Sequence, residues 1–186
     1  MMTEKAKMLA GEPYLPNNAE LIADRKRAKL LFQKINSLNT DKEREKHILF
    51  KELLGSHKKS FIIESPFFCD YGYNIHLGKN VFINYNNCFL DSGKITIGDN
   101  TIIGPNVQLY SVNHPMDAAT RNTLVEYSKP IAIGQNCWIG GGVVIIPGVT
   151  LGDGVVVGAG SVVTKSFKSN VFIAGNPAKV IRKIAP

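Results

Sequence analysis

Residues 133–165, IGQNCWIGGGVVIIPGVTLGDGVVVGAGSVVTK, repeat with a period of six. An aliphatic residue returns at every sixth position, at Ile133, Ile139, Ile145, Leu151, Val157 and Val163. Six residues make one short strand and a corner, and three such sides close a triangular coil of about 18 residues. The aliphatic residues of successive coils then stack inside the prism. The stretch therefore predicts a mainly β chain that forms a parallel β-helix.

The repeat extends upstream of this stretch and is interrupted once. Hexads run through residues 71–88 and 97–108, and the period resumes at Ile133, 24 positions after Leu109. We expect the glycines that follow the aliphatic position to form corners with positive φ, which Gly, Asn and Asp tolerate. These glycines are Gly72, Gly78, Gly98, Gly104, Gly134, Gly140, Gly152 and Gly158.

The N-terminal third carries a helical pattern instead. Within residues 1–56, charged residues separate apolar residues that recur at helical spacing. These are Leu21, Ala28, Leu31, Ile35 and Leu38. The capping-box sequence from Thr40 to Glu43 predicts the start of a second helix, which we expect to end at Gly55.

The two patterns divide the chain into two parts. We expect a helical segment over residues 1–58 and a β-helix over residues 59–186. Because a packed solenoid accepts insertions only as outward loops, the break in the repeat predicts a loop over residues 111–130.

The composition argues against several classes of partner. Lys and Arg number 22 against 15 Asp and Glu, for a net charge of +7, but they form no stripe interleaved with aromatics, as nucleic-acid surfaces do. No apolar run approaches the roughly 18 residues of a membrane span, and the N-terminus lacks the apolar region of a signal peptide. We expect a cytoplasmic protein that binds neither nucleic acid nor membrane.

The predicted loop contains the first candidate catalytic residue. It opens with Asn113-His114-Pro115, and proline restricts the residue before it to extended geometry. Histidine is the side chain whose ordinary pKa lies near physiological pH, so His114 is a candidate general base. The alternative is an ordinary polar loop residue.

Taken together, the motifs resemble the maltose and galactoside O-acetyltransferases of the hexapeptide-repeat family. The resemblance rests on TEKAKMLAGEPY, CDYGYNIHLG, HPMDAATRN, GQNCWIGGGVVIIPGVTLGD, GAGSVVTK and GNPAKVIRKI, and it covers nearly the whole chain. It implies a left-handed β-helix, acetyl-CoA as donor, a sugar hydroxyl as acceptor, no metal, and a homotrimer with active sites between neighbouring subunits.

The resemblance also implies roles at the centre of the reaction. It makes His114 the base that deprotonates the acceptor hydroxyl, and the amide of Gly141 a donor to the oxyanion. Asn84 matches a position that hydrogen-bonds the acceptor. From their positions in the sequence, Asp91 and Glu126 are both candidate partners of the imidazole, and the sequence does not choose between them. Asp91 is also a candidate to bind a sugar hydroxyl of the acceptor.

The acceptor-binding positions depart from the galactoside enzyme. Asp70 stands where that enzyme carries Ser, Ser92 replaces an acidic residue beside Asp91, and Arg25 is retained. Pro16 with Asn17 replaces an acidic residue that contacts the acceptor there. The loop sequence is closer to the maltose-type branch.

The resemblance places the donor along one edge of the β-helix. The pantetheine arm of the donor passes Gly141, Ala159, Thr164 and Lys165, and Lys179 and Arg182 lie near its phosphates. The cations also fit a polyanionic ligand, although a solvated basic tail is the alternative. Trp138 either lines the thioester end of the site or packs at a subunit seam.

Other functions fit the sequence less well. The chain lacks the full GxGxxG and GxxxxGK[ST] motifs. A zinc enzyme of the γ-carbonic anhydrase type needs three histidines, and the repeat region holds only His76 and His114. The cysteines, Cys69, Cys88 and Cys137, are scattered and favour small buried groups over a disulfide framework. An acetyltransferase for a xenobiotic or amino acid, and a non-catalytic binding module, stay open.

Overall fold

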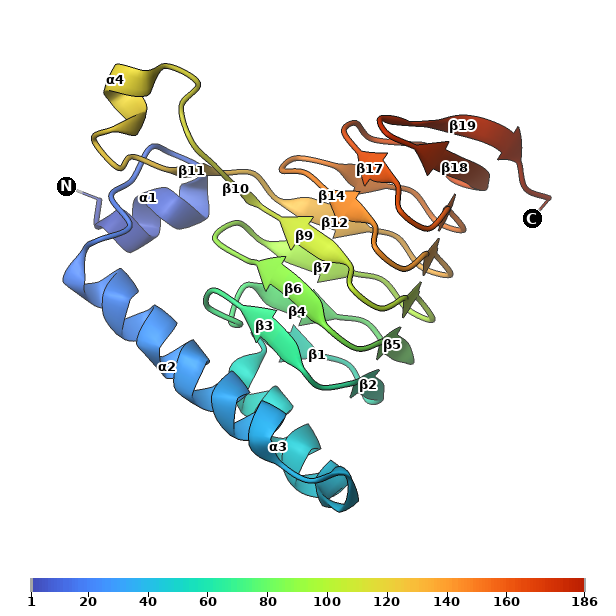
Figure 1. The fold of residues 1–186 in the computed structure, drawn as a ribbon, viewed down its shortest axis with the longest axis horizontal. Helices are drawn as coiled ribbons and strands as arrows, with labels where there is room; N and C mark the ends of the chain where they lie inside the picture. Colours follow the sequence, from blue (N-terminus) through green and yellow to red (C-terminus); the bar gives the residue numbers. More distant parts are fainter. Residues whose placement is uncertain (1, 186) are drawn as a thin grey trace.

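Three β-sheets form the faces of a prism, and the chain winds around them coil by coil (Figure 1). Their strands pair in parallel, except for the antiparallel pair β18 and β19 at the end of the second face. The structure is a computed structural model that describes residues 2–185. The first face contains β1 Ser56–His57, β4 Ile75–Leu77, β7 Ile95–Ile97, β12 Ile131–Ile133 and β15 Thr150–Leu151. The second face contains β2 Phe61–Ile63, β5 Val81–Ile83, β8 Ile102–Ile103, β13 Trp138–Ile139, β16 Val156–Val157, β18 Val171–Gly175 and β19 Ala178–Lys183. The third face contains β3 Phe67–Cys69, β6 Asn87–Leu90, β9 Gln108–Tyr110, β14 Val144–Ile145 and β17 Val162–Val163.

The faces meet at three corners, where the turns of successive coils stack. The asparagine corner, between the first and second faces, comprises residues 78–80, 98–100, 134–136 and 152–154. The glycine corner, between the second and third faces, comprises residues 84–86, 104–106, 140–142 and 158–160. The loop corner, between the third and first faces, comprises residues 70–74, 91–94, 111–130, 146–149 and 164–166.

The aliphatic position of the repeat points into the prism, as the period predicted. On the first face, Ile97, Ile133 and Leu151 lie beside one another in register and are at most 3% exposed. Burial of each such side chain contributes about 1.5–3 kcal/mol. The stack therefore forms one continuous core, and the mainly β solenoid is confirmed.

The coils are not all of one length, and the difference lies at the loop corner. Ile133 pairs with Leu151, 18 positions later, whereas Leu77 pairs with Ile97, 20 positions later. The two extra residues fall between the third and first faces. The same corner accepts the long excursion of the third coil, so it is the widest part of the prism.

The glycines after the aliphatic position are explained by close approach, which corrects the expectation of positive φ. All of them except Gly72 have ordinary φ values. A Cβ at Gly98 would lie 2.5 Å from the backbone N of Gln135 in the next coil. The left-handed residues come two positions later, at Asn80, Asn86, Asn100, Asn106 and Asn136, with φ between 55° and 60°.

The helices of the N-terminal segment pack against the first coils of the prism (Figure 1). They are α1 Glu4–Ala10, α2 Ala19–Ser37, a 3₁₀ turn at Thr40–Lys42 and α3 Glu43–Leu53. The apolar stripe of α2 is confirmed, because Leu21, Ala28 and Ile35 are fully buried. No helix within residues 2–185 is both long enough and apolar enough to cross a membrane.

Two local expectations at α3 were wrong. Thr40 makes no capping box, because it lies inside the 3₁₀ turn and neither this turn nor α3 begins with a side-chain cap. Gly55 is not a left-handed helix end, because Leu54 ends the helix in extended geometry. Instead, a Cβ at Gly55 would lie 1.8 Å from the carbonyl oxygen of Tyr73. Tertiary contact therefore decides both positions.

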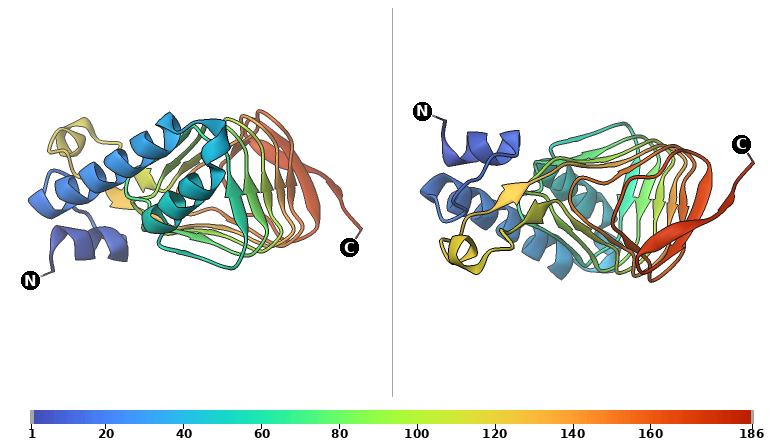
Figure 2. Two further views of the ribbon diagram at one scale, coloured as in Figure 1. Left: turned by 90° about the horizontal axis from the view of Figure 1, so that it is seen from below. Right: turned by 90° about the horizontal axis from the view of Figure 1, so that it is seen from above.

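The excursion of the third coil is a short ribbon held by the N-terminal segment. β10 Val112–Asn113 and β11 Tyr127–Ser128 pair antiparallel, and α4 Ala118–Arg121 lies between them. α1 packs beside this ribbon, as both views in Figure 2 show. The Ser128 hydroxyl donates to the Met8 carbonyl at 2.7 Å. Segments 120 positions apart in the sequence thus meet at the loop corner.

The spacing between coils predicts that two glycine-to-alanine changes lower the free energy of unfolding by different amounts. Gly98→Ala forces a Cβ against backbone and should lower the free energy of unfolding by about 3 kcal/mol or more. Gly160→Ala meets no atom within 4 Å and carries only the penalty of its φ of +71°, about 1 kcal/mol. Urea unfolding of the two variants checks this. Equal losses would contradict the close-approach explanation.

Candidate active site

His114 stands where the chain leaves the loop corner. β10 ends directly before it and Pro115 follows. Its backbone N–H donates to Asn113 Oδ1 at 2.9 Å. The side chain is about half exposed, at 51%. The backbone of His114 is therefore fixed by a hydrogen bond, and its imidazole is accessible to a ligand.

Glu126 is the carboxylate next to this imidazole. Its Oε1 lies 3.9 Å from His114 Nε2, within the range of an ion pair. Its Oε2 accepts a hydrogen bond of 2.5 Å from the Tyr14 hydroxyl. The backbones of Tyr14 and Glu126 also pair, at 2.9 and 3.0 Å. Of the two carboxylates that the sequence offered as partners of His114, the structure brings Glu126 into contact.

Asp91 has a different place, inside the loop corner. It is fully buried, and its Oδ1 accepts from the backbone N–H groups of Asp70 at 3.0 Å and Tyr71 at 2.8 Å. Its Oδ2 accepts from the N–H of Asn74 at 3.2 Å. Ser92 beside it is 2% exposed. Asp91 therefore holds the wide turn through its backbone contacts, and a role of Asp91 or Ser92 in binding the acceptor stays a prediction.

Asp70 is the unusual acid of this corner. Burial, together with the neighbouring carboxylates of Asp91 and Glu126, raises the pKa of Asp70 to about 7. The Arg25 guanidinium opposes this shift. Arg25 itself donates to the Tyr71 hydroxyl and the Pro16 carbonyl, both at 2.7 Å. It thus ties α2 to the loop corner.

A separate cleft of about 450 Å³ runs along the glycine corner. Asn84 lies at one end, and its Oδ1 accepts from the N–H of Tyr85 at 2.8 Å. Trp138 borders the cleft and is 57% exposed. The wall between them is made of small residues, including Gly104, Gly140, Gly141, Gly158 and Ala159. The missing side chains leave room for an extended ligand against the backbone.

The small residues also leave backbone donors open. Within residues 2–185, the N–H groups of Gly141 and Ala159 donate to no protein acceptor, whereas those of Gly140 and Gly142 do. At the asparagine corner the equivalent N–H of Gln135 is occupied by the Asp153 carboxylate, at 2.9 Å. The cleft therefore presents two free amide donors in successive coils.

The cations expected near the phosphates of a donor lie in two places. Lys179 and Arg182 are exposed on β19, and Arg182 lies over the ring of Phe172, which borders the cleft. Thr164 and Lys165 are also exposed, but they lie at the loop corner, beyond the coils that carry His114. Lys165 nevertheless lines a groove with Val180 and Lys183, so the two places meet at β19.

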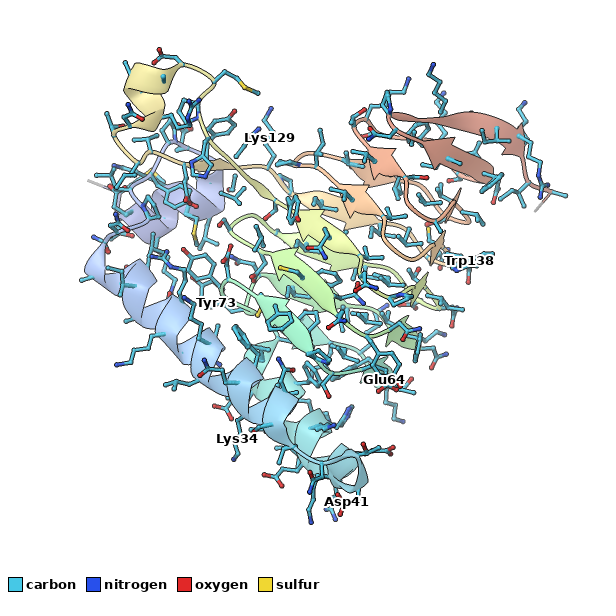
Figure 3. All side chains as sticks on the ribbon, in the orientation of Figure 1. Lys34, Asp41, Glu64, Tyr73, Lys129 and Trp138 are labelled. Atoms are coloured by element: carbon cyan, nitrogen blue, oxygen red, sulfur yellow. The ribbon has the colours of Figure 1, made fainter. Side chains whose placement is uncertain are left out.

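The candidate residues thus form two half-sites on different corners. His114, Glu126, Asp70 and Arg25 belong to the loop corner, and Asn84, Gly141 and Ala159 to the glycine corner. In Figure 3, Trp138 lies at the opposite edge of the prism from Tyr73 and Lys129, which mark the loop corner. Tyr14 is the one functional candidate that sequence reasoning missed, because its contact with Glu126 spans 112 positions.

The remaining candidates for chemistry are the cysteines and groups of metal-ligating residues. Cys69, Cys88 and Cys137 are unpaired, and burial raises the pKa of each thiol, to about 11 for Cys88. No group of three or more His, Cys, Asp and Glu residues in the described part of the chain is arranged to hold a metal ion.

Two family patterns match parts of this chain. Residues 7–58 match the maltose acetyltransferase hexapeptide capping motif, and residues 130–165 match the hexapeptide repeat of succinyl-transferase. The galactoside O-acetyltransferase of Escherichia coli is 41% identical over 183 residues, which cover 98% of this chain and 89% of that protein.

Two solved structures have the same fold over the whole chain. A maltose O-acetyltransferase from Clostridium difficile 630 is 48% identical with a TM-score of 0.97, covering 100% of this chain and 99% of the other. A hexapeptide-repeat acetyltransferase from Vibrio cholerae, complexed with acetyl-CoA, is 38% identical with a TM-score of 0.91, covering 100% of both chains.

The raised pKa of Asp70 predicts a pH-dependent stability difference. The unfolded carboxyl releases its proton near 3.8 and the folded one near 7, so ionisation costs the folded wild type stability as the pH rises between these values. Asp70→Asn should gain stability relative to wild type over this window, on the order of 3 kcal/mol above pH 7.

Urea unfolding of both proteins from pH 4 to pH 8 checks this difference. Asp41→Asn, at an exposed position of the 3₁₀ turn, serves as the control. A constant difference between Asp70→Asn and wild type across the range would contradict the assignment.

Proposed function

Since the chain belongs to the hexapeptide-repeat acetyltransferases of the maltose and galactoside O-acetyltransferase type, we propose that it moves an acetyl group from acetyl-CoA to a sugar hydroxyl. It is an acetyl-CoA-dependent acetyltransferase by this membership. The observation that carries the finer proposal is the pairing of an open imidazole with a carboxylate on one corner, and free amide donors on the next.

His114 acts as the general base in this reaction. It removes the proton from the acceptor hydroxyl while that oxygen attacks the thioester carbon, and such a base contributes about 10²–10⁴-fold. The Glu126 carboxylate, 3.9 Å from Nε2, stabilises the imidazolium that forms. The proton then passes from His114 to the thiolate of CoA as the carbon–sulfur bond breaks, so no covalent enzyme intermediate is needed.

The amide of Gly141 stabilises the oxyanion of the tetrahedral intermediate. Its N–H donates to no other acceptor in the described chain and opens on the cleft. Donors held in place before the reaction stabilise developing charge without reorganisation. The N–H of Ala159, one coil further, is available to an amide of the pantetheine arm, and Asn84 at the other end of the cleft to the acceptor.

The donor's phosphates meet the cations at the C-terminal end. Lys179 and Arg182 on β19, with Lys165 at the loop corner, supply the positive charge that a pyrophosphate and a 3′-phosphate require. Thr164 adds a hydroxyl next to Lys165. Trp138 borders the cleft as an apolar wall for the arm.

We also propose that the active site is complete only between two subunits of a trimer. The half-sites lie on different corners of one chain, so the glycine corner of one subunit must face the loop corner of its neighbour. Six outward-facing apolar residues run in register along the second face beside the cleft: Ile62, Phe82, Ile102, Trp138, Val156 and Phe172. Ile62, Ile102 and Trp138 are each at least 50% exposed. Such a patch favours association.

The acceptor is proposed to be a sugar because polar groups surround His114. Asp70 and Glu126 offer carboxylate acceptors at the loop corner, which suit a ligand rich in hydroxyl donors. The three unpaired cysteines fit a reducing compartment, and we propose that the enzyme acts in the cytoplasm.

His114→Ala should lower acetyl transfer by about 10²–10⁴-fold while leaving CoA binding intact, because the imidazole acts on the acceptor hydroxyl and the amides and cations bind CoA. Thiol release from acetyl-CoA is measured with maltose, glucose, galactosides, serine and chloramphenicol. His76→Ala is the matched control, since His76 contacts Ser56 outside both half-sites.

The relative turnover rates with these acceptors show which class of acceptor the enzyme prefers. Turnover with serine or chloramphenicol alone would replace the sugar by another acceptor. A wild type that does not bind CoA in calorimetry would point to a non-catalytic module.

Complementation between two inactive variants tests the shared site. His114→Ala removes one half-site, and Ala159→Trp fills the cleft of the other. Co-expressed with different tags and purified as mixed trimers, they should regain about one third of wild-type activity, because one junction in three joins two intact halves. Mixed trimers that stay inactive would contradict a site between subunits.

A further inference from the structure

We propose that Tyr14, from the N-terminal helical segment, is a positioning residue that holds Glu126 beside His114. The proposal rests on the proposed function, because it concerns the geometry of the same base. It assigns a role in the reaction to a segment that otherwise packs against the end of the prism.

Tyr14 controls both the backbone and the carboxylate of Glu126. The N–H of Tyr14 donates to the Glu126 carbonyl at 2.9 Å, and the N–H of Glu126 donates back at 3.0 Å. The phenol donates to Oε2 at 2.5 Å. Three hydrogen bonds from one residue leave Oε1 as the oxygen directed at His114 Nε2.

Tyr14 can hold this position because its own ring is buried and packed on several sides. It is 1% exposed and packs with Met8, Leu21 and Tyr71 in a cluster separate from the main core. Burial, and beside it the Glu126 carboxylate, raise the pKa of the Tyr14 hydroxyl above its usual range. The phenol therefore keeps its proton and donates throughout the working range of pH.

The excursion has few other anchors. Its ribbon pairs only two residues on each strand, and α4 within it buries no residue. Beyond the ribbon, the Ser128 contact to Met8 is again a contact with the N-terminal segment. The position of Glu126 relative to His114 therefore depends on Tyr14 and its neighbours.

Two kinds of measurement on purified trimers test the proposal. Tyr14→Phe keeps the ring and removes the donor, and Tyr127→Phe is the matched control. Tyr127 directly follows Glu126 as the first residue of β11, and its hydroxyl makes no hydrogen bond to any of residues 2–185. Glu126→Gln and the double variant with Tyr14→Phe complete a cycle.

The first readout does not depend on turnover. In protein labelled with ¹³C at histidine Cε1, the His114 signal, identified by its loss in His114→Ala, should shift in Tyr14→Phe and in Glu126→Gln. It should not shift in Tyr127→Phe. An unmoved His114 signal in Tyr14→Phe overturns the proposal, even for a wild type that acetylates none of the acceptors tried.

The second readout is kinetic. Tyr14→Phe should lower kcat about tenfold, because a misplaced base is less effective, while the KM for acetyl-CoA stays unchanged. The double variant should lose no more than Glu126→Gln alone. If the losses in kcat of the two single variants multiplied in the double variant, the proposal would be overturned. A loss in kcat accompanied by a higher KM for acetyl-CoA would also overturn it. Absent turnover in the wild type would instead refute the proposed function and leave the spectroscopic result to decide on Tyr14.

Discussion

Each coil of the prism lies at hydrogen-bonding distance from the next, and this spacing of about 4.8 Å governs the rest of the structure. It stacks the aliphatic residues Ile97, Ile133 and Leu151 into one core. It leaves no room for a Cβ at positions such as Gly98. It also places the N–H groups of Gly141 and Ala159 in successive layers, so the cleft is a direct product of the repeat.

Because the core of the prism is full, variation is confined to the corners. The loop corner absorbs two extra residues in the early coils and the whole excursion that carries His114. A buried carboxylate, Asp91, holds the widened turn by accepting backbone N–H groups that a regular corner would pair otherwise. The excursion has no apolar cluster of its own in the described chain. It is held instead by α1 and by Tyr14, which belong to a separate apolar cluster.

The regular and the irregular corners carry different kinds of functional group. The regular corner supplies backbone donors and space, which suit a long donor molecule and a developing oxyanion. The irregular corner supplies the titratable side chains, His114, Glu126 and Asp70. A rigid repeat cannot bend to bring two of its own corners together, and a neighbouring copy of the chain offers the simplest way to join them.

The sequence by itself determined the fold and named the candidates for the site. A period of six can be satisfied only by coils that bury every sixth residue, and the family motifs named His114, Gly141 and the cationic positions. Only the tertiary structure decided which carboxylate lies beside the imidazole, why the corner positions must be glycine, and that Tyr14 contacts Glu126. These depend on contacts between coils or between residues 112 positions apart, such as Tyr14 and Glu126, and local pattern carries no information about which distant backbones approach each other.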